Sequence, residues 1–96
     1  MGVYTPEELE RIKYIARTVF PSAKEIEVYE SGRLNFAIVV EGISEIDMDT
    51  MMRLAEKIRR TDLGGVYLLK SGECMPLDFE VYVNHRERTL GVRIWF

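Results

Sequence analysis

The C-terminal stretch of residues 77–96, "LDFEVYVNHRERTLGVRIWF", predicts two antiparallel strands joined by the turn "NHRER". Apolar and polar residues alternate in both halves, which is typical of strands that are buried on one face only. One register gives this hairpin a continuous apolar face, made by the pairs Val83–Leu90, Val81–Val92 and Phe79–Ile94. We expect that face to pack into the core of the domain.

The opposite face of the hairpin supports the same register. It places Glu80 opposite Arg93 and Tyr82 over Gly91. A pair of opposite charges, or an aromatic ring that covers a strand glycine, stabilises neighbouring strands. The two faces therefore agree on one pairing.

The N-terminal region predicts an amphipathic helix. Thr5 and Glu8 have the spacing of a capping box, Pro6 stands at the first helical position, and Pro21 ends the periodic run. The residues expected on its buried face are Leu9, Ile12, Ile15, Ala16, Val19 and Phe20.

Residues 24–42 predict a second hairpin. Pairing Val28 with Phe36 and Ile26 with Ile38 collects the large apolar side chains on one face, across a loop of three to five residues.

Residues 44–65 predict a second helix, capped by Ser44 or Asp47 and stopped by Gly64 and Gly65. Its expected buried stripe is Met48, Met51, Met52, Ala55 and Ile58. Methionines at helical spacing are more typical of core packing than of an adaptable binding surface.

The order of these elements predicts the fold class. Residues 66–71, "VYLLKS", add a short strand before the loop "SGECMP", so the chain runs helix, two strands, helix, three strands. We predict one α+β domain over residues 1–96, a two-layer sandwich with both helices on one face of a largely antiparallel five-stranded sheet.

Composition bounds the class of protein. With 47% hydrophobic and 30% charged residues the chain is typical of a soluble globular domain. Its longest apolar run, "FAIVV", is far too short to span a membrane, and the first 20 residues carry charges where a signal peptide needs an apolar core. We expect a cytoplasmic protein. The absence of glutamine and the abundance of Glu and Arg favour a heat-adapted source.

Candidate catalytic residues are few. Cys74 and His85 form the only thiol and imidazole pair, but a strand of about eight residues separates their loops by about 25 Å. A single cysteine also excludes multi-cysteine zinc sites. No phosphate-binding glycine loop, HExxH or GxSxG motif is present. We expect no catalytic residue and no cofactor.

Acidic residues near the second helix raise the alternative of a metal site. Glu45, Asp47, Asp49 and Glu73 carry the oxygen ligands that hard cations prefer. Their spacing fits no calcium loop, and carboxylates at a helix start are explained by capping and by the helix dipole. We therefore predict no metal site.

Connectivity predicts a sorting of charge between the two ends of the sheet. If a fifth strand follows the second helix, that helix must end beside the "NHRER" turn. An arginine-rich pole would then collect Arg33, Arg59, Arg60, His85, Arg86 and Arg88. An acidic pole at the other end would hold Glu41, Glu45, Asp47, Asp49, Glu73 and Asp78. Arginine clusters bind phosphates, so RNA or DNA binding is the alternative function.

The sheet face away from the helices is the better candidate surface. Its expected members Tyr29, Val39, Tyr82, Arg93 and Trp95 are richer in aromatic residues than a solvated face needs. The net charge of −3 and the interleaved carboxylates disfavour nucleic acid there. No GXXG loop, RNP motif or terminal helix indicates a known RNA-binding fold. We predict a non-enzymatic module that binds itself or another protein through this face or the C-terminal edge strand.

Overall fold

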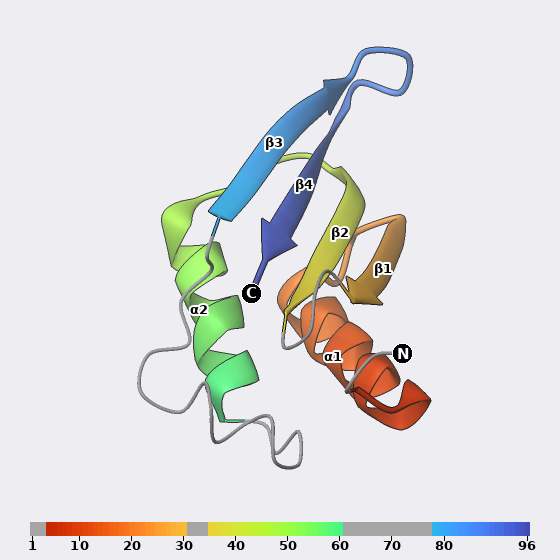
Figure 1. Ribbon diagram of the computed structural model, residues 1–96. Helices are drawn as coiled ribbons and strands as arrows, with labels where there is room; N and C mark the ends of the chain where they lie inside the picture. The colour runs from red at the N-terminus through yellow and green to blue at the C-terminus, as the bar shows by residue number, and fades with distance from the viewer. Residues whose placement is uncertain (1–3, 31–34, 61–77) are drawn as a thin grey trace.

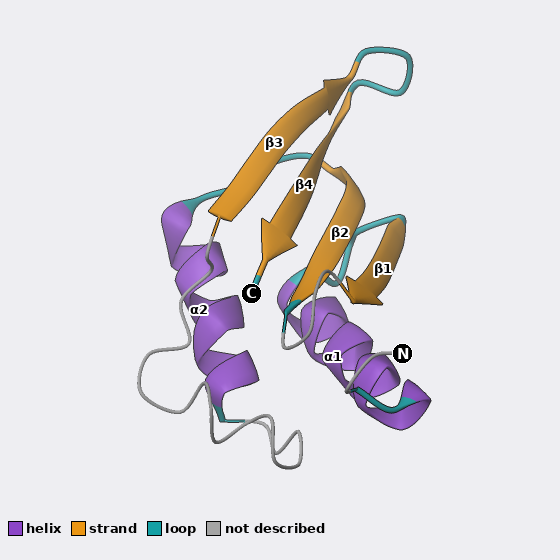
Figure 2. Ribbon diagram, in the orientation of Figure 1, coloured by secondary structure: helices purple, strands orange, loops and turns teal. Residues whose placement is uncertain are grey.

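The residues that the structure describes form two helices and an antiparallel sheet, so the α+β prediction is confirmed (Figure 1). The computed structural model describes residues 4–30, 35–60 and 78–96. The elements are α1 (Pro6–Val19), β1 (Glu25–Glu30), β2 (Phe36–Ile43), α2 (Met48–Arg59), β3 (Asp78–Asn84) and β4 (Thr89–Trp95). The four strands lie in the order β1-β2-β4-β3 (Figure 2). The fifth strand predicted at residues 66–71 lies outside the described residues.

Helix α1 begins and packs as its sequence predicts. The Glu8 amide donates to Thr5 Oγ1 at 3.1 Å, and the Thr5 amide donates to Glu8 Oε1 at 2.9 Å, which completes the capping box. Its apolar face enters the core through Ile12, Ala16 and Val19. This face alone repeats at three- and four-residue spacing, so the helix has one orientation that buries it.

Helix α2 is capped by Asp47, whose Oδ1 accepts a 2.7 Å hydrogen bond from the Thr50 amide. Its buried face is Met51, Leu54, Ala55 and Ile58. The prediction that Met48 and Met52 are also buried is wrong, since both are exposed. Met52 follows the buried Met51 and is therefore turned to the side of the buried face. Met48 is the first residue of the helix, one turn before the first buried residue.

The β3–β4 hairpin has the predicted register at every position. Val83 pairs with Leu90, and Glu80 lies opposite Arg93. The turn is closed by the pair Asn84–Thr89, and Asn84 Oδ1 accepts a 3.1 Å hydrogen bond from the Glu87 amide. Because the two strands are joined by four residues, local geometry decides their pairing.

The register of the β1–β2 hairpin differs from the prediction by two residues. Val28 lies opposite Ile38, not Phe36, and Ile26 lies opposite Val40. A shift of two residues keeps every side chain on the same face, so the alternation of the sequence did not distinguish the two registers. Phe36 instead lies opposite Glu30, and its buried ring stacks on Phe96 with centroids 5.2 Å apart.

The C-terminal strand is central in the sheet, so its prediction as an edge strand is wrong. β4 pairs with β2 on one side and with β3 on the other. Among the described residues the sheet edges are therefore β1 and β3. The exchange of backbone hydrogen bonds between Phe36 and Phe96, at 3.2 and 2.8 Å, extends the β2–β4 pairing to the last residue.

The core lies between the helices and one face of the sheet. The helices contribute Ile12, Ala16, Val19, Met51, Leu54, Ala55 and Ile58, and the strands contribute Ile26, Phe36, Ile38, Val40, Ile43, Val92 and Ile94. All belong to one cluster, so both helices cover the same face of the sheet. None of the described helices has the length and hydropathy of a membrane-spanning helix.

Candidate interaction surface

Strand β3 carries an exposed apolar stripe, which we define as Phe79, Val81 and Val83. These side chains are 43%, 42% and 55% exposed, although the sequence predicts them in the core. They lie on the core face of the sheet, since Phe79 pairs with Ile94 and Val81 with Val92, both fully buried. The prediction of their face is thus confirmed and that of their burial is wrong. The buried cluster, traced through the described residues, stops at β4.

A shallow depression continues this stripe toward the hairpin. Its volume is about 440 Å³, and its lining is Ser44, Val83, His85, Arg88, Thr89 and Leu90. Val83 thus belongs to both features. The apolar side chains of Val83 and Leu90, next to the turn, are flanked by the polar residues His85 and Arg88 in the turn. An interface core with a polar rim has the same arrangement.

The backbone of β3 also offers hydrogen-bonding groups at the sheet edge. The Phe79 amide donates to Asp78 Oδ1 at 2.8 Å and so points away from β4. Successive amides of a strand alternate in direction, so the amides of Val81 and Val83 point outward as well. No described strand pairs with this side of β3. The stripe and the outward amides belong to the same three residues.

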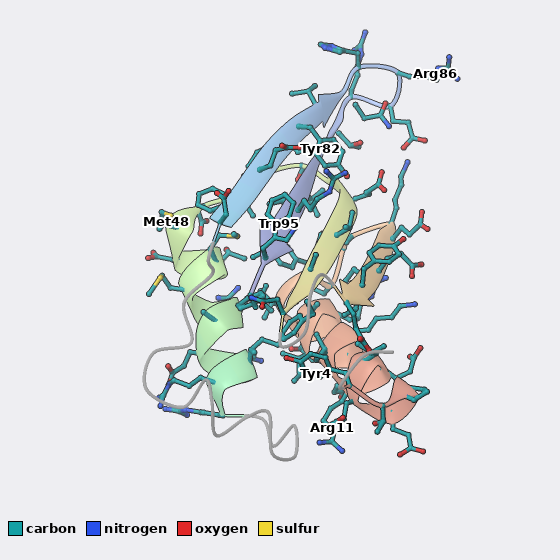
Figure 3. The ribbon with its side chains drawn as sticks, in the orientation of Figure 1. Tyr4, Arg11, Met48, Tyr82, Arg86 and Trp95 are labelled. Atoms are coloured by element: carbon teal, nitrogen blue, oxygen red, sulfur yellow. The ribbon has the colours of Figure 1, made fainter. Side chains whose placement is uncertain are left out.

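The opposite face of the sheet, the open face, carries the aromatic residues predicted there, of which Figure 3 labels Tyr82 and Trp95. Arg93 lies at its centre, with the guanidinium carbon 5.9 Å from the ring centroids of both Tyr82 and Trp95. Glu80 Oε1 lies 3.7 Å from Arg93 Nη1. Tyr82 and Trp95 are half-buried, and Val39 is half-buried beside Arg93. The guanidinium of Arg93 thus interacts with Glu80 and with both aromatic rings of the same chain.

Tyr82 packs closely against the neighbouring strand. Its ring lies against Gly91, where a Cβ atom would overlap the ring carbons Cε2 and Cζ. Burial, and next the nearby Glu41 carboxylate, raise the pKa of the Tyr82 phenol above its ordinary value of 10.0. Tyr82 is therefore neutral at physiological pH. It acts as a packing group with one polar end.

The open face is acidic around its single central arginine. The cross-strand rows are Glu25–Glu41–Gly91–Tyr82, Glu27–Val39–Arg93–Glu80 and Tyr29–Ala37–Trp95–Asp78. Five carboxylates thus share this face with Arg93. That balance opposes contact with phosphates and suits a polar rim facing protein. Tyr29, at 56% exposed, is the one aromatic residue of the face that remains largely open.

The described members of the predicted arginine-rich pole do not lie together, which corrects the prediction that they gather at one end of the sheet. Arg59 and Arg60 lie at the end of α2, whereas His85, Arg86 and Arg88 belong to the hairpin turn at the far end of the sheet (Figure 1; Figure 3 shows Arg86). Helix α2 starts at the hairpin side, because Ser44 before it lines the same depression as His85. The α2 axis of about 18 Å then separates the two groups.

Both arginines of α2 also have partners already. Glu56 Oε1 lies 2.7 Å from Arg59 Nη2 and 2.9 Å from Arg60 Nε. The hydrogen bond from Arg59 lowers the pKa of Glu56 below its ordinary value. Arg33 lies outside the described residues. Of the predicted acidic pole, Glu41, Glu45 and Asp47 lie at the hairpin side, which mixes the two charges.

The remaining predicted sites fall partly outside the described chain. Cys74 and Glu73 lie in residues 61–77, so neither the thiol nor that carboxylate is placed. Over residues 4–30, 35–60 and 78–96, no three His, Cys, Asp or Glu side chains gather as metal ligands. Asp47 serves as a helix cap, as the sequence analysis preferred.

Comparisons with known proteins identify no relative. No protein-family model matches the chain, and no curated protein or solved structure matches it.

Sequence reasoning found the residues of the β3 stripe but assigned them to the core. Interface cores and domain cores have a similar apolar composition, so the alternation of β3 predicts a buried face without saying what buries it. Burial of the stripe depends on which strands the helices cover, and no local sequence pattern predicts that.

Proposed function

We propose that this protein is a small interaction module without catalytic activity, which acts by binding protein along strand β3. The observation that carries the proposal is the stripe of Phe79, Val81 and Val83, exposed on an edge strand in rows whose other members are core. A long edge strand with an apolar face associates unless something covers it. Contiguous exposed apolar surface is typical of protein–protein contact sites.

The open face supports the proposal from the other side of the same strand. Tyr82 alternates with the stripe residues along β3, and Arg93 and Trp95 lie in the neighbouring strand. A partner strand that pairs with β3 would lie beside Tyr82 and Glu80 on one face and beside the stripe on the other. Aromatic residues and arginine are the side chains enriched in such interfaces.

Binding of nucleic-acid phosphates receives no comparable support. The described arginines of the predicted arginine-rich pole are divided between two ends of the domain, and two of them pair with Glu56. The chain carries a net charge of −3. Without a concentrated basic surface the electrostatic gain from counterion release is small.

The proposal is tested by photo-crosslinking in the source cell. A photoreactive phenylalanine analogue replaces Val83 in the full chain, and Tyr14, which is 70% exposed on α1, carries the same group as a matched control. We expect protein adducts of defined mass from position 83 and none of that mass from position 14. An absence of adducts from position 83, or the same adducts from both positions, would contradict the proposal.

A further inference from the structure

We propose that the partner of β3 is a second copy of the same chain, bound antiparallel so that Val81 of each copy lies on a two-fold axis. This inference rests on the proposed function, because it names the protein that occupies the β3 edge. The dimer would join two four-stranded sheets into one continuous sheet, with the helices of both copies on the same side.

The first support is that β3 is complementary to itself. Its seven residues, DFEVYVN, read in opposite directions about Val81, place Phe79 opposite Val83 of the second copy and Val81 opposite its own equivalent. On the other face Glu80 meets Tyr82 of the second copy, and Asp78 meets Asn84. No pair in this register opposes two like charges, and all seven residues are used.

The second support is that the neighbouring registers place less favourable pairs of side chains opposite each other. A register centred on Glu80 opposes the two Glu80 carboxylates directly, which is unfavourable across a strand pair. A register centred on Tyr82 shortens the paired segment and moves Phe79 opposite His85 in the turn. Registers shifted by an odd number turn the stripe of one copy toward the polar face of the other. The charges and the stripe thus select one alignment.

The third support is backbone geometry. The Phe79 amide points away from β4, and those of Val81 and Val83 share its direction by strand alternation. Pairing Phe79 with Val83 of the second copy and Val81 with Val81 therefore brings hydrogen-bonding residues together. In the separate chain the Asp78 carboxylate holds the Phe79 amide, and in the dimer this amide exchanges that partner for a carbonyl group.

The fourth support is continuity of the buried rows. Ile26, Val40 and Val92 form a buried row across β1, β2 and β4, and exposed Val81 is its last member. A second Val81 on the axis would continue this row into the equivalent row of the other copy. Exposed apolar surface on β3 would then become buried without any rearrangement of the domain.

The experiment combines sedimentation with directed disulfide formation, using the full chain. Over about 1 µM to 1 mM, the range of standard and weak interfaces, we expect a reversible monomer–dimer equilibrium. Val81→Lys sets two ammonium groups on the axis and should weaken dimerisation about tenfold or more. Tyr14→Lys, on α1, is the matched control and should leave the equilibrium unchanged. Circular dichroism melting verifies that both variants fold.

The register is read from cysteine variants in which Cys74 is replaced by Ser. Under mild oxidation Val81→Cys should form a dimer disulfide, because hydrogen-bonded antiparallel pairs have Cα atoms about 5.5 Å apart. Phe79→Cys alone should not, because its equivalent lies about four residues, or about 13 Å, along the strand. Mixing Phe79→Cys with Val83→Cys should restore cross-linking. Self-linking of Phe79→Cys would overturn the register.

Amide hydrogen exchange separates failure of this inference from failure of the proposed function. We expect protection of the Val81 and Val83 amides that rises with protein concentration. A chain that stays monomeric to about 1 mM, with fast exchange at both amides, overturns self-association and leaves β3 open to a different protein. Protection that is already complete in the monomer means that the edge is paired within the chain, for instance by residues 61–77, and overturns both.

Discussion

Gly91 and Tyr82 lie opposite each other in β4 and β3, and the tyrosine ring fills the space that a side chain at position 91 would need. A Cβ atom there would overlap Cε2 and Cζ and lie 2.7 Å from Oη. Glycine at this position is required by close approach and not by backbone conformation. The relationship also holds the ring beside the guanidinium of Arg93, 5.9 Å from the ring centroid.

We predict that Gly91→Ala destabilises the domain by about 1–3 kcal/mol, the usual range for overpacking. The ring must leave its place against β4, which exposes it and separates it from Arg93. Urea denaturation of the wild-type and variant proteins measures the difference in the free energy of unfolding.

The control is the same substitution in a Tyr82→Ala background. With no ring to displace, Gly91→Ala should cost less than about 0.5 kcal/mol, since alanine is no worse than glycine in a strand. An equal cost in both backgrounds would show that the ring is not the cause.

The phenol of Tyr82 should ionise at a higher pH than an exposed tyrosine. Burial and the Glu41 carboxylate both disfavour the phenolate and raise its pKa above 10.0. The difference in ultraviolet absorbance between wild type and Tyr82→Phe during alkaline titration reports this group. Glu41→Gln should lower the pKa of Tyr82, whereas Glu10→Gln on α1 should not change it.

The same shift sets the pH dependence of stability at alkaline pH. Because the pKa is higher in the folded chain, the contribution is fully present below the unfolded value near 10 and is lost as the pH rises through the folded pKa. The free energy of unfolding of wild type should therefore fall more steeply above about pH 10 than that of Tyr82→Phe. Parallel curves would contradict this assignment.

The Asp47 cap should make α2 sensitive to acid. Hydrogen bonding from the Thr50 amide lowers the pKa of Asp47 below 3.8, so its contribution to stability is present above that value and is lost as the pH falls through the folded pKa. Asp47→Asn keeps an N-cap acceptor without a titrating charge. Comparison of thermal melts at neutral and strongly acidic pH should show a smaller acid-induced loss in Asp47→Asn than in wild type.

Arg88 adopts a left-handed backbone conformation, with φ of 57°, in the hairpin turn. Side-chain sterics make that conformation unfavourable for arginine, whereas glycine adopts it freely. We predict that Arg88→Gly raises the free energy of unfolding by about 0.5–1 kcal/mol and that Arg88→Val lowers it. Arg86→Gly, in the same turn at negative φ, should not stabilise, and a gain equal to that of Arg88→Gly would contradict the explanation.

The α1 start and the β3–β4 pairing were predictable because their determinants are local. Thr5 and Glu8 are three residues apart and satisfy each other's amides, so the cap depends on nothing distant. In β3–β4 a four-residue turn limits the registers, and the Glu80–Arg93 and Tyr82–Gly91 pairs select among them. Short-range contacts of this kind are visible in the sequence itself.

The β1–β2 register was predictable only to within two residues. Alternation assigns Ile26, Val28 and Ile38 to one face but leaves the offset open. The observed offset sends Phe36 to the end of the sheet, where it meets Tyr4 with ring centroids 5.4 Å apart and stacks on Phe96. Those two partners come from opposite ends of the chain.

By itself, therefore, the sequence determined the described helices and strands, their polar and apolar faces and the α+β class, because hydrogen-bonding caps and side-chain periodicity act over a few residues. Tertiary structure decided which apolar faces are covered and where the charges gather. The position of β4 between β2 and β3, and the direction of α2, left the β3 stripe exposed and separated Arg59 and Arg60 from Arg86 and Arg88. The covered faces and the placement of charges both depend on contacts between distant segments, which compete for the limited surface of the two helices. The sequence of a single segment does not determine the result of that competition.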